Sequence, residues 1–92
     1  MEIQAGQVAK SLRGHDKDEI FVIIKTEENY AYIVDGKLRM LDDPKKKKIK
    51  HLDITNYVCN DLKEKIINAE RVSNSDIREA LEIYKNLKSK GE

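Results

Sequence analysis

Residues 20–26, Ile-Phe-Val-Ile-Ile-Lys-Thr, constrain the fold of this chain more than any other segment. Branched and aromatic side chains favour extended backbone, and the run is too short for a typical helix. It therefore predicts a strand that is buried on much of both faces and forms the centre of the core. A polar turn at 27–29 leads to a second predicted strand at 30–35, in which Tyr30 and Tyr32 point to the same side. For these tyrosines, packing in the core or against the C-terminal region is favoured over stacking on bases.

Further short strands are predicted on both sides of this pair. Partial alternation predicts a strand at 7–12, before a polar loop in which Gly14 can adopt positive φ. Asp35-Gly36 favours a tight hairpin turn, because both central residues of such a turn need positive φ. We expect a strand at 37–41 after this turn.

The basic segment that follows opens with Pro44, which interrupts regular structure before four consecutive lysines. These lysines are expected on a loop that faces solvent or an anion, because an unpaired buried ammonium is costly. Residues 49–54 supply a last strand of uncertain register. Five short strands suit a small SH3-like barrel better than a sandwich, which needs more strands.

After residue 56 the spacing becomes helical. A short helix is predicted from Asn60-Asp61 through Ala69, and a longer one after capping side chains at 73–76, with Gly91 at its end. The apolar stripe of the longer helix consists of Ile77, Ala80, Leu81, Tyr84 and Leu87. The predicted fold is mainly β with a helical appendage. Residues 1–56 form the barrel, and residues 57–92 form an extension packed on or near it.

The charge of the chain is concentrated in one segment. The net charge of the 92 residues is only +1, yet residues 37–51 hold seven lysines or arginines and two aspartates. A local basic segment is typical of an anion-binding surface. Taken alone, it would also fit a solvated charged loop or a nuclear localisation signal.

The sequence gives little support for catalysis, metal binding or insertion into a membrane. The single cysteine, Cys59, forms no disulfide within the chain, and the pairs His15-Asp16 and His51-x-Asp53 lack a third ligand or a nucleophile. We therefore expect no enzyme, no metal and no cofactor. The chain shows neither a secretory signal nor an apolar stretch long enough to span a bilayer, so a cytoplasmic location is expected.

Several motifs together resemble a known family. The strings Gly6-Gln-Val8, Gly14-His-Asp-Lys17 and Phe21-Val-Ile23 follow the KOW pattern of a strand, a glycine loop and a second strand. Residues 33–39, Ile-Val-Asp-Gly-Lys-Leu-Arg, and 44–52, Pro-Lys-Lys-Lys-Lys-Ile-Lys-His-Leu, resemble the KOW-domain RNA-binding proteins of Gram-positive bacteria, which are related to KOW-bearing large-subunit ribosomal proteins. The likeness covers about the first 55 residues, and Asp76-Ile-Arg-Glu-Ala-Leu81 adds a similar terminal helix.

This resemblance implies an SH3-like barrel that binds structured RNA without catalysis, with ribosomal RNA or the large subunit as candidate partners. One departure weakens the KOW loop, because Asp18 replaces a second glycine found in many such loops. The expected RNA-binding residues are Arg13, Gly14, His15, Lys17, Lys37, Arg39, Lys45, Lys46, Lys47, Lys48, Lys50 and His51. For the loop residues, a plain tight turn is an equal alternative. The alternative function is a protein-interaction adaptor that uses the barrel or the apolar helix stripe.

Overall fold

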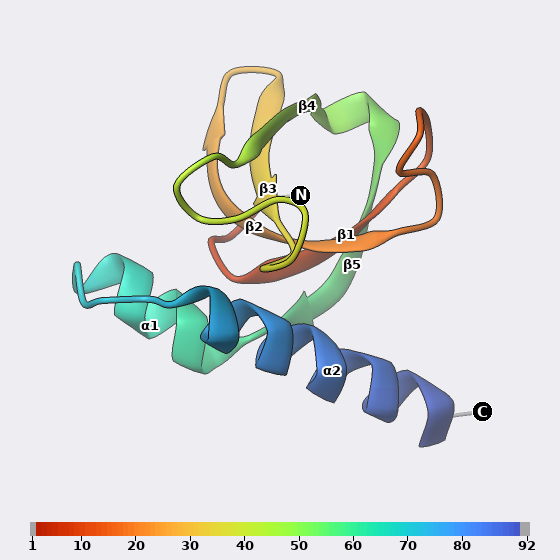
Figure 1. Cartoon of the computed structure of the whole chain (residues 1–92). Coiled ribbons are helices and arrows are strands. Elements are labelled where there is room, and N and C mark those ends of the chain that lie inside the picture. Colours follow the sequence, from red (N-terminus) through yellow and green to blue (C-terminus); the bar gives the residue numbers. More distant parts are fainter. Residues whose placement is uncertain (1, 91–92) are drawn as a thin grey trace.

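The computed structural model of the chain describes residues 2–90, which form a five-stranded antiparallel barrel-like sheet followed by two helices (Figure 1). The strands run in the spatial order β4-β3-β2-β1-β5. The elements are β1 (Gln7–Ser11), β2 (Ile20–Glu27), β3 (Tyr30–Val34), β4 (Lys45–Lys48), a 3₁₀ turn (Ile49–His51), β5 (Leu52–Val58), α1 (Asn60–Ile67) and α2 (Asn74–Lys90). The expected fold class, an SH3-like barrel with two C-terminal helices, is confirmed.

The strands bury apolar side chains on two faces of the sheet. Inside the barrel the core consists of Ala9, Phe21, Ile23, Ala31, Ile33 and Leu52. Val8, Val22 and Val34, which pair across β1, β2 and β3, belong to the opposite face. The central strand is therefore buried on both sides, as its run of branched residues predicts.

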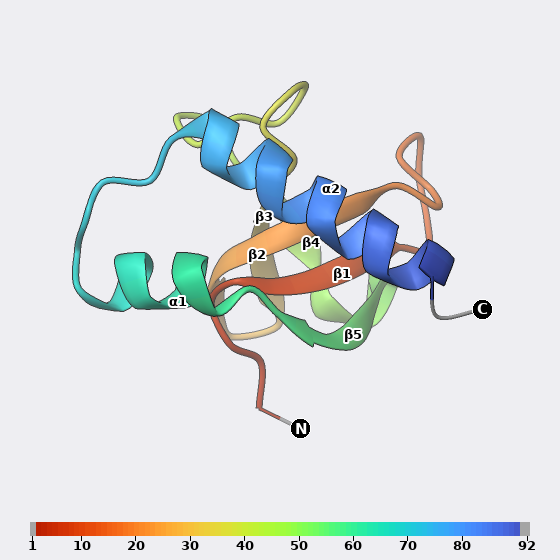
Figure 2. The same ribbon diagram turned by 90° about the horizontal axis from the view of Figure 1, so that it is seen from below.

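The two helices cover that second face. Leu62 of α1 and Ile77, Ala80 and Leu81 of α2 pack with the three valines. Figures 1 and 2 show α2 lying along the side of the barrel formed by β1 and β2. Tyr57 of β5 contacts Tyr84 of α2, with ring centroids 5.4 Å apart. Within residues 2–90, no helix is both long and apolar enough to cross a membrane.

The start of α2 carries a reciprocal cap. The backbone N–H of Asp76 donates to Ser73 Oγ at 3.1 Å, and the N–H of Ser73 donates to the Asp76 carboxylate at 3.0 Å. These bonds satisfy donors that the first helical turn leaves free, as the capping side chains predict. Gly91, the expected end of the helix, lies outside the described residues.

The predicted strand at 37–41 is wrong, because this segment belongs to a loop between β3 and β4. The Asp35 carboxylate accepts hydrogen bonds from the backbone N–H groups of Lys37 and Arg39, both at 2.9 Å. Gly36 adopts φ +78° at the turn, but Asp35 does not have positive φ, so the expected tight hairpin turn at Asp35-Gly36 is wrong. The side chain of Asp35 thus closes a compact loop in place of a strand ladder. As a result, Leu38 is 92% exposed.

The loop predicted for the four lysines is also wrong, because Lys45–Lys48 form β4 and pair with β3. The predicted final strand at 49–54 begins late, since residues 49–51 form the 3₁₀ turn and β5 starts at Leu52. The 3₁₀ turn redirects the chain from β4 at one edge of the sheet to β5 at the other. Pairing to β3 thereby fixes where each lysine points.

Candidate nucleic-acid interface

The four lysines of β4 alternate between two faces of the strand. Lys46 and Lys48 lie opposite Tyr32 and Tyr30 of β3, and both lysines are exposed. Lys45 and Lys47 lie opposite Ile33 and Ala31, which are fully buried. Successive side chains of a strand point to opposite faces. The basic run therefore divides into one outward pair and one inward pair.

The inward pair binds a single carboxylate, that of Asp16 in the β1–β2 loop. Lys47 Nζ donates to Asp16 Oδ1 at 2.6 Å, and Lys45 Nζ lies 2.6 Å from Asp16 Oδ2. Lys47 also donates to Ser11 Oγ at 2.7 Å and to the carbonyl of Arg13 at 2.6 Å, and its side chain is only 7% exposed. All four lysines face solvent or an anion, as expected, but for Lys45 and Lys47 the anion is the Asp16 carboxylate of the protein itself.

The electrostatics of Asp16 agree with this geometry. Burial alone would raise the pKa of its carboxyl group. Hydrogen bonds from Lys45, Lys47 and Ser11, together with the charge of Lys47, outweigh burial and hold this pKa well below its ordinary value of 3.8. The carboxylate is thus ionised at neutral pH and connects β4 to the β1–β2 loop. Lys45 and Lys47 are structural residues in this arrangement.

The β1–β2 loop presents some of its predicted contact residues to solvent. Arg13, His15 and Lys17 are exposed, and Gly14 has φ +91°. Asp18 also adopts a left-handed conformation, with φ +74°, and its N–H donates to the carbonyl of Ser11 at 2.8 Å. Residue 18 is therefore a position whose backbone conformation favours glycine.

Basic groups also gather near the 3₁₀ turn. The pKa of His51 is lowered, first by burial of the ring and then by the charges of Arg13, Lys50, Lys48 and Lys47. Arg13, Lys48 and Lys50 are exposed, and the N–H of Leu12 donates to the His51 carbonyl at 2.9 Å. These contacts bring the β1–β2 loop and the end of β4 together. The result is a local positive potential on one part of the barrel.

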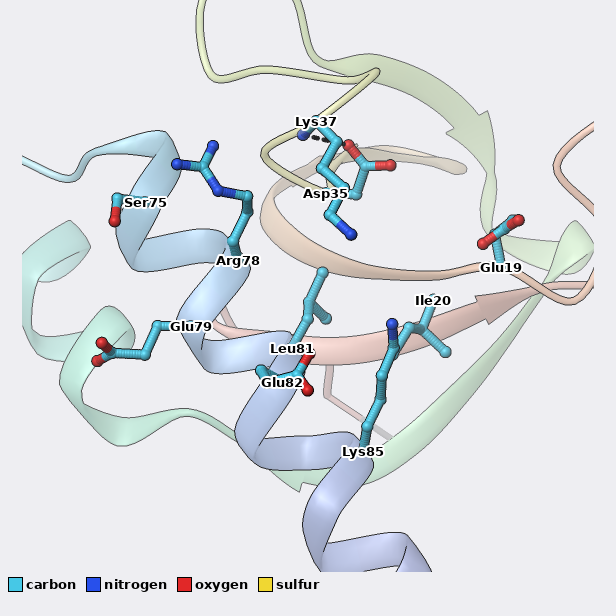
Figure 3. A pocket seen from close by; sticks show the side chains of 10 residues that line it. All are labelled: Glu19, Ile20, Asp35, Lys37, Ser75, Arg78, Glu79, Leu81, Glu82 and Lys85. Carbon is cyan, nitrogen blue, oxygen red and sulfur yellow. Dashed lines mark hydrogen bonds between the residues drawn. The ribbon is translucent and has the colours of Figure 1, made fainter.

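Lys37 and Arg39 lie elsewhere, in the β3–β4 loop. Together with His15 and Lys45, and with the acids Asp16, Glu19 and Asp35, they line an open hollow of about 580 Å³. A second hollow of about 400 Å³ separates this loop from α2, and Figure 3 shows Lys37 there among acidic and basic side chains. Its charged lining comprises four acids, Glu19, Asp35, Glu79 and Glu82, and three bases, Lys37, Arg78 and Lys85. Such a mixed lining has no net attraction for phosphate.

The expected packing of Tyr30 and Tyr32 in the core or against the C-terminal region is wrong. Tyr30 and Tyr32 are half-buried on the outer side of the sheet, whereas Ala31 and Ile33 fill the barrel interior. The ammonium of Lys46 lies 4.6 Å from the centroid of the Tyr30 ring, and that of Lys25 lies 4.6 Å from the Tyr32 ring. Tyr57, rather than either of these, pairs with the C-terminal helix. Their alternation with Ala31 and Ile33 is the sequence signal for an outward aromatic row.

No protein-family model matches this sequence, and no curated protein is significantly similar to it. The resemblance to KOW-domain RNA-binding proteins therefore remains a prediction from the motifs of the chain.

Proposed function

We propose that this protein binds structured RNA, with ribosomal RNA as a candidate target, mainly through phosphate contacts. The observation that supports the proposal is the row of outward cations on β4 and the 3₁₀ turn beside two half-buried aromatic rings. Lys46, Lys48 and Lys50 are exposed there, next to Tyr30 and Tyr32. Basic and aromatic side chains on one sheet surface are typical of RNA-binding modules.

The chemistry of the cations favours contact with the RNA backbone over base reading. Lysine is a flexible point charge, without the planar fork with which arginine reads a guanine edge. Arg13 and Lys17 in the β1–β2 loop add further phosphate contacts. Lys45 and Lys47 contribute indirectly, because their ion pairs with Asp16 hold β4 beside this loop. RNA binding should therefore weaken steeply with salt.

The test compares two triple variants with equal changes in charge. One carries Lys46→Ala, Lys48→Ala and Lys50→Ala, and the control carries Lys85→Ala, Lys88→Ala and Lys90→Ala on α2, where the three lysines are also exposed. Affinity for a folded ribosomal RNA fragment is measured by fluorescence anisotropy over a range of salt concentrations. In the first variant we expect the slope of log affinity against log salt to fall by roughly 2 to 3. Equal behaviour of the two variants, with both folded by circular dichroism, would refute the proposed surface.

A protein-interaction adaptor is the second candidate. Ile77, Ala80 and Leu81 of the predicted stripe are buried against the barrel, but Ile83 and Leu87 remain 45% and 52% exposed. These two residues favour a modest contact site on α2. A pull-down that survives nuclease treatment and is lost in Leu87→Asp would support the adaptor.

A further inference from the structure

We propose that the hollow beside Tyr30 binds one unpaired nucleotide of the RNA, with its base stacked on the tyrosine ring. This inference rests on the proposed RNA-binding function and specifies the part of the RNA that is recognised. The hollow has a volume of about 510 Å³ and is lined by Asn29, Tyr30, Lys48, Ile49 and Lys50.

The walls of the hollow come from segments that hydrogen bonds hold in place. The backbone N–H of Ile49 donates to the carbonyl of Asn29 at 2.8 Å, which fixes the 3₁₀ turn against the β2–β3 turn. Glu28 makes that turn tight, with φ +53°. Tyr30 pairs with Lys48 across β3 and β4. The hollow is therefore preorganised, which lowers the entropy cost of ordering a ligand there.

The lining combines the groups that a nucleotide requires. Tyr30 offers an aromatic ring and Ile49 an aliphatic wall, both suited to the faces of a base. Asn29 carries an amide that can both donate to and accept from a base edge. Lys48 and Lys50 are the only charged residues of the lining, so the site attracts an anion such as phosphate. The hollow beside α2 is lined by both acidic and basic side chains, so it has no such preference for an anion (Figure 3).

The ring of Tyr30 already attracts a cation. Lys46 Nζ lies 4.6 Å from its centroid, and the side chain of Lys46 is 49% exposed. A flexible, exposed ammonium can move from the ring to a phosphate when a base takes its place. Tyr32 is a poorer platform, because two lysines lie over its ring, at 4.6 and 5.9 Å, and its hydroxyl donates to Glu27.

The stacking geometry selects unpaired nucleotides. A base within a duplex is stacked on both sides and cannot present its face to a side chain. A base in a loop, a bulge or an end can be turned out and stacked on an aromatic ring. We therefore infer that the protein prefers structured RNA that carries an unpaired base next to a helix.

The first experiment compares a labelled RNA hairpin with a uridine loop and a blunt RNA duplex of the same number of phosphates. We expect Tyr30→Ala to weaken hairpin binding roughly 5- to 150-fold and to leave duplex binding unchanged. Tyr30→Phe should bind as the wild type does, because it keeps the ring. Tyr32→Ala should have a smaller effect than Tyr30→Ala, and equal losses would refute the assignment to this hollow.

A spectroscopic readout tests stacking directly. The chain contains no tryptophan, so Tyr30→Trp introduces a single one. Binding of the hairpin should quench its fluorescence, whereas the duplex should not. Unaltered hairpin binding by Tyr30→Ala would overturn the nucleotide site, and the proposed function would stand if Lys48→Ala still weakened both RNAs. If the wild type bound neither RNA, the proposed function and the nucleotide site would both fail.

Discussion

Lys47 and Lys48 have opposite environments although they are neighbours in the chain. The side chain of Lys47 is 7% exposed and donates to three oxygen atoms, whereas Lys48 is exposed on the outer face. Removing one partner of a buried ion pair leaves the other charge without compensation. Substitution by alanine should therefore lower the stability of the fold at Lys47 and the affinity for RNA at Lys48.

Lys47→Ala should lower the free energy of unfolding by about 3 kcal/mol, because among residues 2–90 it leaves Asp16 with Lys45 alone as an ion-pair partner. Lys48→Ala should change it by less than about 0.5 kcal/mol, as is usual for an exposed residue. Chemical denaturation of the two variants measures both values. Equal losses would contradict the division of β4 into two faces.

The Asp16 carboxylate makes stability depend on pH. Its pKa is lowered in the folded protein, so its contribution is present above the unfolded pKa, near 3.8, and is lost as the pH falls toward the folded pKa. We expect Asp16→Asn to be much less stable than the wild type at pH 7. The difference should shrink as the pH falls below about 4. Urea denaturation from pH 7 to pH 2 checks this, and a constant difference would contradict the assigned ion pairs.

At the scale of the elements, the β1–β2 loop contains one non-glycine residue, Asp18, in a left-handed backbone conformation. Asp18 holds φ +74°, and its side chain forms a long ion pair, 3.7 Å, with Lys10 at the surface. Exposed pairs of this kind contribute little. The conformational cost of a non-glycine residue with positive φ therefore dominates at this position.

Asp18→Gly should raise the free energy of unfolding by about 0.5 to 1 kcal/mol, because glycine adopts positive φ without a Cβ clash. Asp18→Asn removes the charge but keeps a side chain that tolerates this conformation, so its effect should be small. Thermal unfolding of both variants separates conformation from charge. A gain that appeared in Asp18→Asn and not in Asp18→Gly would show that charge, and not conformation, limits stability here.

The elements differ in how far local pattern predicts them. The strands around residues 20–26 and 30–35 and both helices follow from hydrophobic spacing, which is a local property, and α2 also follows from its capping side chains. The cap expected at Asn60-Asp61 is wrong, because Cys59 precedes α1 and makes no side-chain cap hydrogen bond. β4 could not be predicted, because four lysines carry no hydrophobic alternation. The partner that buries Lys47 is Asp16, which lies 31 residues away in the chain. The alternation of basic and aliphatic residues at 37–41 predicts a strand, but no strand forms there. Hydrogen bonds from the backbone to the Asp35 carboxylate close a loop instead.

The candidate site was also predictable only in part, because its geometry depends on pairing between separate segments of the chain. The basic character of the segment is visible in composition, so Lys46, Lys48 and Lys50 could be named from the sequence. The roles of Lys45 and Lys47 depend on the register between β3 and β4. A shift of one residue in register would exchange the buried and exposed lysines.

At the scale of the whole molecule, the helices divide the surface of the barrel. α2 covers the valines of β1, β2 and β3, whereas the tyrosines at the other end of β3 stay open beside the cations of β4. One part of the outer face of the sheet is thus covered by the helix, and another part of the same face, at Tyr30 and Tyr32, is available for a ligand. This division can be tested by introducing the same charge at two positions along one helix.

Leu81→Asp should lower the free energy of unfolding by about 3 kcal/mol or more, because Leu81 is 6% exposed and its replacement would bury an unpaired carboxylate. Leu87→Asp should change it by less than about 0.5 kcal/mol, because Leu87 is 52% exposed. Denaturation measures the two values, and anisotropy should show that Leu87→Asp retains RNA binding. Loss of RNA affinity in folded Leu87→Asp would place the ligand on α2 and not on the tyrosine and lysine surface of β3 and β4.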